Sequence, residues 1–190
     1  NERRNVRYIG SFFAEVDLFE GLRYRVNFGP DFSRHRRGEF QAANSSNRDG
    51  STSWAEYYQN ERFSYVVENL LYYDKTIANN HELGVTLMQS IQQNRFEESE
   101  ITASDLPYDT QKFYALETTY RGSSDGFNHG FSESSLMSFM GRINYSLMNK
   151  YLFTLTGRYD GSSVLAEGNK WDFFPSLAFA WKMQEEPFLR

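Results

Sequence analysis

Residues 151–159 read Tyr-Leu-Phe-Thr-Leu-Thr-Gly-Arg-Tyr, and large apolar side chains recur at every second position. Successive side chains of an extended strand point to opposite faces, whereas those of a helix repeat about every 3.6 residues. The stretch therefore predicts a strand with one apolar face and one mostly polar face. The apolar face takes Tyr151, Phe153, Leu155 and Tyr159. The other face takes Leu152, Thr154, Thr156 and Arg158.

The same period of two recurs through most of the chain, before and after this stretch. It is weaker in 61–74, where Glu68 and Asn69 have opposite parity, and in 81–95, where Gln89 interrupts the apolar set. We therefore predict seven long antiparallel strands. The predicted strands are residues 6–18, 22–33, 61–74, 81–95, 132–147, 151–163 and 171–183.

The segments between these strands alternate between short and long. The short ones are 19–21, 75–80 and 148–150, the long ones are 34–60 and 96–131, and 164–170 is intermediate. Outer-membrane barrels have this asymmetry, with short periplasmic turns and long extracellular loops. The predicted strands also exceed the roughly 9–11 residues that cross the hydrocarbon core at a tilt. An all-β, up-and-down meander in the wall of a transmembrane barrel is therefore predicted.

The composition fits such a wall and excludes several other classes. Aromatic residues make up 17% of the 190 residues, and barrels concentrate them at both membrane interfaces. The net charge of −5 argues against a nucleic-acid binder, and the absence of cysteine excludes disulfides and thiolate metal sites. The longest apolar run, Leu177–Trp181, is too short for a transmembrane helix. The alternative is a soluble β-sandwich that binds glycans through its aromatic residues.

The two-sided strands predict which side chains meet lipid and which meet the lumen. The predicted lipid-facing residues are Phe139, Ile143, Tyr145, Tyr151, Phe153, Leu155, Tyr159, Leu177, Phe179 and Trp181. The predicted lumen-facing residues are Arg142, Asn144, Thr154, Thr156, Arg158 and Lys182. Seven up-and-down antiparallel strands cannot close a barrel, and an open edge in lipid leaves backbone groups unpaired. We therefore expect the chain to be part of a larger wall.

An ordered series of short motifs marks the C-terminal third. It opens with Ser-Leu-Met-Ser-Phe-Met-Gly-Arg-Ile-Asn-Tyr at 135–145. It continues with Lys-Tyr-Leu-Phe-Thr at 150–154, Arg-Tyr-Asp-Gly-Ser-Ser at 158–163, Phe-Pro-Ser at 174–176, Ala-Trp at 180–181 and Glu-Glu-Pro-Phe-Leu at 185–189. The series resembles the SusC/RagA family of TonB-dependent outer-membrane transporters. The connector 164–170 departs from the family, because it lacks the Arg-Phe expected after the double serine.

The resemblance implies a fold, a location and partners. It implies that 1–190 is part of a barrel domain of about 22 strands, with the plug domain and the remaining strands outside these residues. It implies a nutrient importer, not an enzyme, in the outer membrane of a Gram-negative-type bacterium, taking up oligosaccharides or oligopeptides without a cofactor. The expected partners are the TonB complex, acting through the plug region, and a SusD-like surface lipoprotein.

Other polar residues have weaker claims to a site, and no catalytic constellation stands out. An acidic group of possible calcium ligands consists of Glu97, Glu98, Glu100, Asp105 and Asp109, whose spacing does not follow the EF-hand. The histidines His35, His81 and His129 lack the spacing of zinc ligands, so no metal site is predicted. The basic run Arg34–Arg37 could hold lipopolysaccharide phosphates, although we expect it to be the solvated base of a loop.

Overall fold

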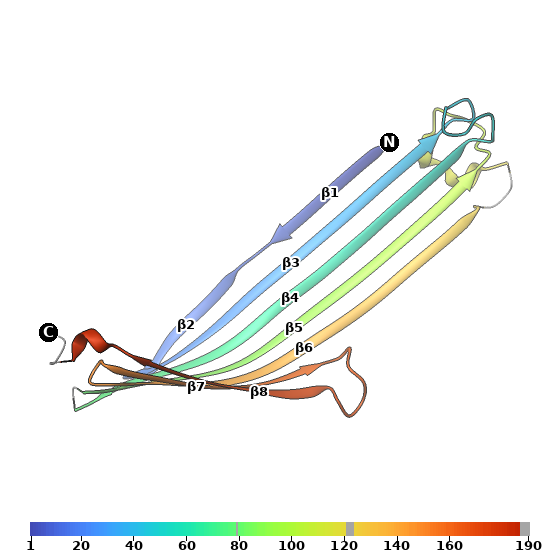
Figure 1. Cartoon of the computed structure of the whole chain (residues 1–190). Coiled ribbons are helices and arrows are strands. Elements are labelled where there is room, and N and C mark those ends of the chain that lie inside the picture. Colours follow the sequence, from blue (N-terminus) through green and yellow to red (C-terminus); the bar gives the residue numbers. More distant parts are fainter. Residues whose placement is uncertain (79, 121–123, 187–190) are drawn as a thin grey trace. The chain divides into compact units, whose positions relative to one another are not determined.

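The computed structural model describes residues 1–78, 80–120 and 124–186, which form one antiparallel sheet (Figure 1). The strand order is β1-β3-β4-β5-β6-β7-β8, and β2 also pairs with β3. The strands are β1 (Glu2–Ile9), β2 (Phe12–Phe19), β3 (Leu22–Gln41), β4 (Trp54–Ile77), β5 (His81–Ser104), β6 (Gly126–Leu147), β7 (Tyr151–Ser162) and β8 (Trp171–Trp181). The predicted all-β, up-and-down meander is therefore confirmed.

The remaining regular structure is three short 3₁₀ helices. They are η1 (Lys112–Tyr114), η2 (Leu116–Thr118) and η3 (Met183–Glu185). No helix within residues 1–78, 80–120 and 124–186 is long and apolar enough to span a membrane. The last motif of the sequence series ends at Pro187, Phe188 and Leu189, which lie outside the described residues.

The first predicted strand, 6–18, is in fact two strands that pair with β3 in one register. Ile9 pairs with Asp31 and Phe12 pairs with Phe28, so residues 10 and 11 lie opposite positions 29 and 30. Pro30 has no backbone N–H to donate to the ladder, which interrupts the pairing at this point. The seven predicted strands therefore become eight without any change of topology.

Strands β3 to β6 are longer than predicted, at 20 to 24 residues each. The long connectors shrink accordingly, from 34–60 to 42–53 and from 96–131 to 105–125. The added strand residues mix polar and apolar side chains on both faces, so the hydropathy no longer alternates although the strand continues. The prediction ended these strands where the apolar stripe ended.

The chain divides into two compact units. Unit 1 comprises 1–9, 30–64 and 94–133, and unit 2 comprises 10–29, 65–93 and 134 onward. Strands β3, β4, β5 and β6 each contribute a segment to both units.

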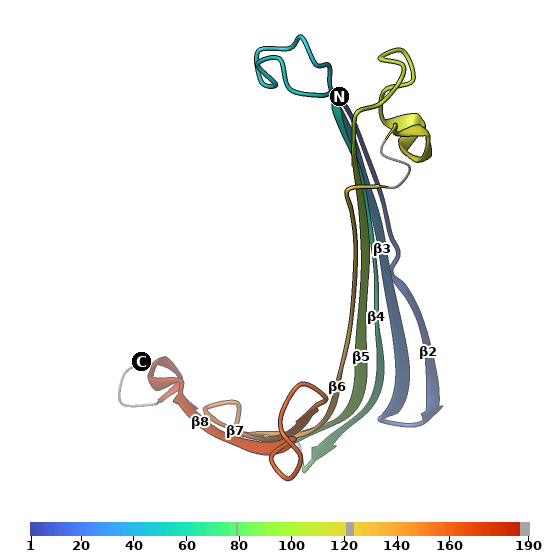
Figure 2. The ribbon, with the colours of Figure 1, turned by 90° about the vertical axis from the view of Figure 1, so that its right-hand side faces the viewer.

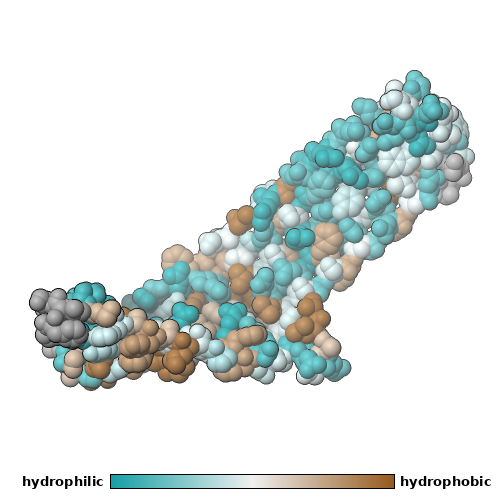
Figure 3. All heavy atoms as spheres, viewed as in Figure 1, coloured by the Kyte–Doolittle hydropathy of each residue, from teal (hydrophilic) through white to brown (hydrophobic). Residues whose placement is uncertain are grey.

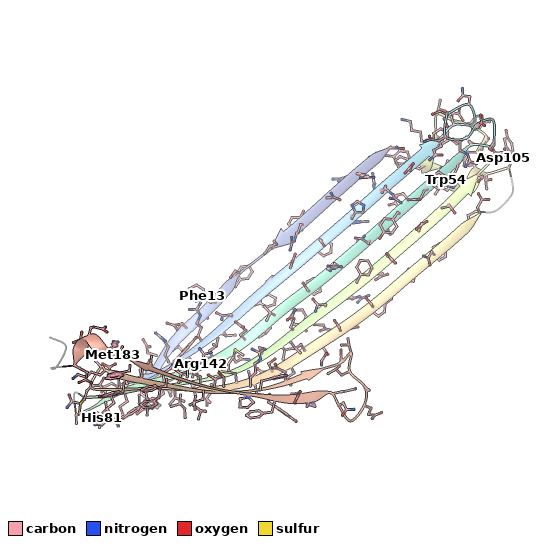
Figure 4. The ribbon with its side chains drawn as sticks, viewed as in Figure 1. Phe13, Trp54, His81, Asp105, Arg142 and Met183 are labelled. Carbon is pink, nitrogen blue, oxygen red and sulfur yellow. The ribbon has the colours of Figure 1, made fainter. Side chains whose placement is uncertain are left out.

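Unit 1 has a small apolar core formed by the connector 105–125 and the strand ends beside it. Its buried side chains are Ala55, Ala103, Leu106, Phe113 and Leu116. The connector is tied down by hydrogen bonds from the backbone N–H of Asp105 to the carbonyl of Ser53, 2.9 Å, and from that of Leu106 to the Ser53 hydroxyl, 2.9 Å. Figure 4 shows Trp54 and Asp105 close together at this point, and Figure 2 shows the connectors 42–53 and 105–125 at the same end of the unit 1 strands.

Unit 2 has almost no apolar interior. Among its described residues, Leu70 is the buried hydrophobic side chain, while large hydrophobic side chains lie exposed on the sheet. A β-sandwich buries one face of each of two sheets against the other. The described residues instead form a single sheet, so the sandwich alternative is wrong for this chain.

Candidate functional site

The pairing of β6, β7 and β8 brings the predicted apolar residues together on one face of unit 2. Tyr145, Phe153 and Phe179 lie opposite one another across the three strands, as do Ile143, Leu155 and Leu177. Directly opposed residues of an antiparallel pair point to the same side. We call this the aromatic face, and it carries all ten residues predicted to meet lipid: Phe139, Ile143, Tyr145, Tyr151, Phe153, Leu155, Tyr159, Leu177, Phe179 and Trp181.

The aromatic face is exposed and rich in ring contacts. Leu177 is 77% exposed and Phe179 is 59% exposed. The rings of Phe153 and Phe179 are 4.9 Å apart between centroids, and those of Tyr151 and Trp181 are stacked at 6.3 Å. Figure 3 shows hydrophobic residues gathered along β7 and β8 on the side in view, and a mostly hydrophilic surface over the strands of unit 1. An apolar surface of this kind marks a membrane or protein contact.

The opposite face of β6 to β8, which we call the polar face, carries cross-strand hydrogen bonds. The Arg142 guanidinium donates to the Thr156 hydroxyl at 3.2 Å, and the Thr154 hydroxyl donates to the Asn144 amide oxygen at 3.0 Å. Arg158 lies on the same face, opposite Met140 in the register. These bonds satisfy polar groups on a face that also carries Met140, Leu152 and Phe174 and is therefore more polar than the aromatic face, without being uniformly hydrophilic.

Arg158 and Lys182 complete the set of predicted lumen-facing residues. Arg158 forms an ion pair with Asp160 at 2.8 Å and donates to the hydroxyl of the fully buried Ser138. Lys182 follows the end of β8, where its ammonium donates to the Asn149 side chain at 2.7 Å. Lys182 therefore lies beside the β6–β7 turn. It falls outside the paired residues of β7 and β8, so its prediction as a lumen-facing residue stays a prediction.

Three polar residues on the aromatic face form a chain of hydrogen bonds. The Tyr24 hydroxyl donates to the Asn69 amide oxygen at 2.6 Å, and the Asn69 amide nitrogen donates to the Gln89 side-chain oxygen at 2.7 Å. They line a groove of about 610 Å³ together with Phe139 and Tyr159 of the aromatic face. Asn69 and Gln89 are the residues that weakened the sequence alternation, and their mutual bonds satisfy them on an otherwise apolar surface.

Unit 1 carries a polar network across β3, β4 and β5. Arg37 forms an ion pair with Glu56, which is 7% exposed, and its guanidinium lies 5.7 Å from the centre of the Tyr58 ring. The Tyr58 hydroxyl donates to the Glu98 carboxylate at 2.9 Å and accepts from the Asn60 amide at 2.9 Å. The hydrogen bond to Glu56 raises the pKa of Arg37, so this cation stays charged. The network offers both donors and acceptors on one surface.

The basic run Arg34–Arg37 lies within strand β3, which corrects its prediction as the base of a loop. Its register with β1 places Arg36 opposite Arg4 and Arg37 opposite Arg3. Arg36 forms an ion pair with Glu2 at 2.5 Å, and the Tyr114 hydroxyl donates to the same carboxylate at 2.7 Å. These two hydrogen bonds, from Tyr114 first and then from Arg36, hold the pKa of Glu2 below its usual value.

The acidic residues considered as possible calcium ligands do not form one cluster. Glu97, Glu98 and Glu100 lie in β5, whereas Asp105 and Asp109 lie in the connector that follows. Glu97 instead pairs with Arg95 at 3.3 Å. Across the part of the chain that the structure describes, no group of three or more histidine, aspartate and glutamate side chains is placed to hold a metal ion.

The histidines also lie apart from one another, each beside a different residue. His35 contacts the Asn5 side chain, His81 lies 2.6 Å from the Tyr145 hydroxyl, and His129 stacks on Phe127.

Sequence reasoning missed a carboxylate that joins three motif residues. Glu186 is 8% exposed and accepts hydrogen bonds from the Tyr151 hydroxyl at 2.7 Å, the Lys150 ammonium at 3.1 Å and the Trp181 indole at 3.2 Å. These bonds, led by that of Tyr151, lower the pKa of Glu186. The only sequence signal was that all four residues fall in the motif series, which did not indicate that they touch.

Comparisons with known proteins connect this geometry with a family, although no family model matches the chain. TonB-dependent receptor P26 of Formosa agariphila is 31% identical over 194 residues, covering 100% of this chain and 19% of that protein. TonB-dependent receptor P3 of the same organism is 30% identical over 195 residues, with the same coverage. TonB-dependent receptor SusC of Bacteroides thetaiotaomicron is 54% identical over 59 residues, which are 31% of this chain and 6% of that protein. The chain thus spans about a fifth of the first two relatives.

The fold has a close counterpart among solved structures. The structure of the RagAB peptide transporter superposes on 99% of this chain with a TM-score of 0.91, at 17% sequence identity, and the match covers 21% of that chain. The same transporter in a closed-closed state also gives a TM-score of 0.91. At this identity the likeness establishes the fold of the sheet.

Proposed function

Because the chain belongs to the SusC/RagA type of TonB-dependent receptors, which reside in the Gram-negative outer membrane, we propose that it forms part of the wall through which such a receptor imports nutrients. The chain corresponds to 19% of the length of its relative P26, so import is a property proposed for the whole receptor. In this proposal residues 1–190 are a partial barrel domain, and the plug and the other strands lie elsewhere in the receptor.

The observation that carries the proposal is the opposite chemistry of the two faces of β6 to β8. The aromatic face meets lipid in this proposal, and the polar face meets the aqueous lumen. Strands β7 and β8 have 12 and 11 residues, close to the roughly 9–11 that cross the hydrocarbon core at a tilt. The chain of Tyr24, Asn69 and Gln89 is compatible with lipid, because their polar groups are bonded to one another.

The parts of β3 to β6 that belong to unit 1 lie outside the hydrocarbon in this proposal. They carry ion pairs on both of their faces, including Arg36–Glu2 on one and Arg37–Glu56 on the other. Charged residues facing lipid near the bilayer midplane cost about 2–4 kcal/mol for Arg or Lys, and water removes that cost. Unit 1 is therefore assigned to the extracellular side, where barrels carry their long connectors.

We propose an oligosaccharide or an oligopeptide as the cargo and a SusD-like lipoprotein as the external partner. Support for a polar cargo comes from the network of Arg37, Glu56, Tyr58 and Glu98, which presents donors, acceptors and an aromatic ring. Energy would reach the receptor from the TonB complex through the plug. Uptake of labelled oligosaccharides and oligopeptides by cells carrying the full-length receptor separates the two cargo classes.

The wall proposal is tested by placing an arginine on each face at adjacent positions. In the full-length receptor, Phe153→Arg should lower the free energy of unfolding from a bilayer by about 2–4 kcal/mol if Phe153 lies near the midplane. Thr154→Arg is the matched control and should cost less, because it faces the aqueous lumen. Phe153 is 41% exposed in the isolated sheet, so a large cost arises only when lipid covers it.

The measurement is urea-induced unfolding of each variant in lipid vesicles. Equal costs for the two arginines, or a larger cost for Thr154→Arg, would contradict the assignment of the faces.

A further inference from the structure

We propose that Arg4, Arg34 and Arg36 form a binding site for the phosphate groups of an outer-leaflet lipid, the phosphorylated glycolipid of the bacterial surface. This inference rests on the proposed function, because it needs the aromatic face to meet lipid. It adds a ligand that the import of nutrients does not require. All three arginines belong to unit 1 and lie on β1 and β3.

The first argument is the pairing of like charges. Arg4 lies directly opposite Arg36, and Arg34 lies opposite Val6, two residues further along the same face. Like charges in directly opposed positions destabilise an antiparallel pair unless anions neutralise them. Glu2 pairs with Arg36 and Glu61 pairs with Arg34. Among the described residues, Arg4 makes no direct ion pair or hydrogen bond and interacts with the Glu2 carboxylate only at longer range. The three arginines thus share two carboxylates, Glu2 and Glu61, which leaves one positive charge in excess.

The second argument is the charge of this strip compared with its surroundings. β1 and residues 30–41 of β3 contain six arginines and three carboxylates. The protein as a whole has a net charge of −5, and the unit 1 part of β5 carries Glu97, Glu98 and Glu100 against a single arginine. Positive charge is thus concentrated at one place in an acidic chain, and guanidinium groups bind phosphate oxygens in a bidentate manner.

The third argument is the aromatic pair next to the arginines. Tyr8 lies opposite Phe32, their rings are stacked at 6.3 Å, and Tyr8 is 68% exposed. Aromatic side chains of this kind favour the membrane interface. Along the same face, Arg34 and Arg36 follow Phe32 by two and four residues, or about 7 and 14 Å of strand. At a strand tilt of about 40°, these distances correspond to roughly 5 and 10 Å along the membrane normal, which is the headgroup layer.

Arg3 provides a control of the same type at the adjacent position. It lies opposite Arg37, on the other face of the β1–β3 pair. Arg37 is already neutralised by Glu56 and covers the Tyr58 ring. Arg3→Gln and Arg4→Gln therefore remove the same charge from neighbouring residues, and only Arg4→Gln removes it from the proposed site.

The test uses the full-length receptor in phosphatidylcholine nanodiscs, with phosphorylated lipid A as the probe and native mass spectrometry as the measurement. We expect Arg4→Gln to weaken lipid A binding about fivefold, the effect of one basic residue near an anionic surface. Arg3→Gln should leave binding unchanged, and Arg4→Lys should retain most of it. Lipid A stripped of its phosphates should bind equally weakly to the wild type and to Arg4→Gln.

Two results would overturn the proposal. One is equal binding of phosphorylated lipid A to Arg3→Gln and Arg4→Gln. The other is displacement of lipid A by millimolar inorganic phosphate, which would indicate a site for the free anion. If Phe153→Arg and Thr154→Arg show that the aromatic face does not meet lipid, the wall proposal fails as well. If they support the wall but the two glutamine variants bind alike, only the lipid site fails.

Discussion

At the scale of single residues, polar side chains in this protein are matched with partners that lie far away in the sequence. Glu186 binds Lys150 and Tyr151 across 36 and 35 residues, and Tyr24 binds Asn69 across 45. Such bonds compensate a polar group for the water that it loses on burial, which would otherwise cost a desolvation penalty. The start of β7 and the end of β8 are thus held together by one carboxylate, that of Glu186.

Glu186 predicts a pH dependence at the end of the β7–β8 hairpin. Its pKa in the folded protein is below the usual 4.5, because Tyr151, Lys150 and Trp181 donate to the charged form. The stabilisation is therefore present above that usual value and is lost as the pH falls through the lowered one. In the full-length receptor, Glu186→Gln should lower the thermal unfolding midpoint at pH 7, and the difference from the wild type should shrink under acidic conditions.

A suitable control is Glu167→Gln, which changes an exposed carboxylate in the connector after β7. Its effect should be small at every pH. A Glu186→Gln midpoint that differs from the wild type by the same amount at neutral and acidic pH would rule out a role for the charged form.

At the scale of elements, residues 105–120 of the connector after β5 form a small folded cap on the strand ends of unit 1. Phe113 is 4% exposed and packs directly over Gly38 of β3, where a Cβ atom would overlap the ring. A glycine in β3 therefore creates the room that the buried ring needs. Phe113 belongs to η1 and is a member of the unit 1 core, so this contact ties the connector to β3.

Gly38→Ala should displace Phe113 and loosen the cap, at a local cost of about 1–3 kcal/mol for overpacking. Limited proteolysis of the full-length receptor should then cut within 105–125 faster than in the wild type, while the receptor still folds. Gly141→Ala is the control, since a Cβ atom there would meet its nearest neighbour, Leu87, at an ordinary 3.7 Å. Equal protease sensitivity of the two variants would contradict the role of Gly38.

At the scale of the whole molecule, the sheet has two edges and a large exposed apolar surface. β8 lies at one edge, and β1 and β2 lie at the other, so their outer backbone groups have no strand partner among the described residues. Unpaired edges template association with further strands, and exposed apolar faces promote it. Both features suit a sheet that continues into a larger wall.

The chain of residues 1–190 on its own should therefore aggregate when it is refolded in water and stay dispersed in detergent micelles. Detergent covers the aromatic face, which water cannot solvate favourably. Sedimentation velocity in the two solvents checks this expectation. A folded monomer in water without detergent would contradict the membrane assignment of the aromatic face.

The sequence by itself determined the class of fold, the two-sided character of β6 to β8 and the family. These features depend on alternation along single strands, and alternation is a local property that follows from backbone geometry. The same reasoning predicted strands β3 to β6 too short, because their segments in unit 1 carry polar residues on both faces. Hydropathy reports burial or lipid contact, and it does not report backbone pairing in water.

Only the tertiary structure decided which distant residues meet. Register placed Arg3 and Arg4 opposite Arg37 and Arg36, and it joined Asn69 to Gln89 where each had looked like a break in the pattern. Chain folding brought Glu186 to Tyr151 and Phe113 to Gly38. Register and loop packing depend on long-range pairing free energies, which no short window of sequence contains.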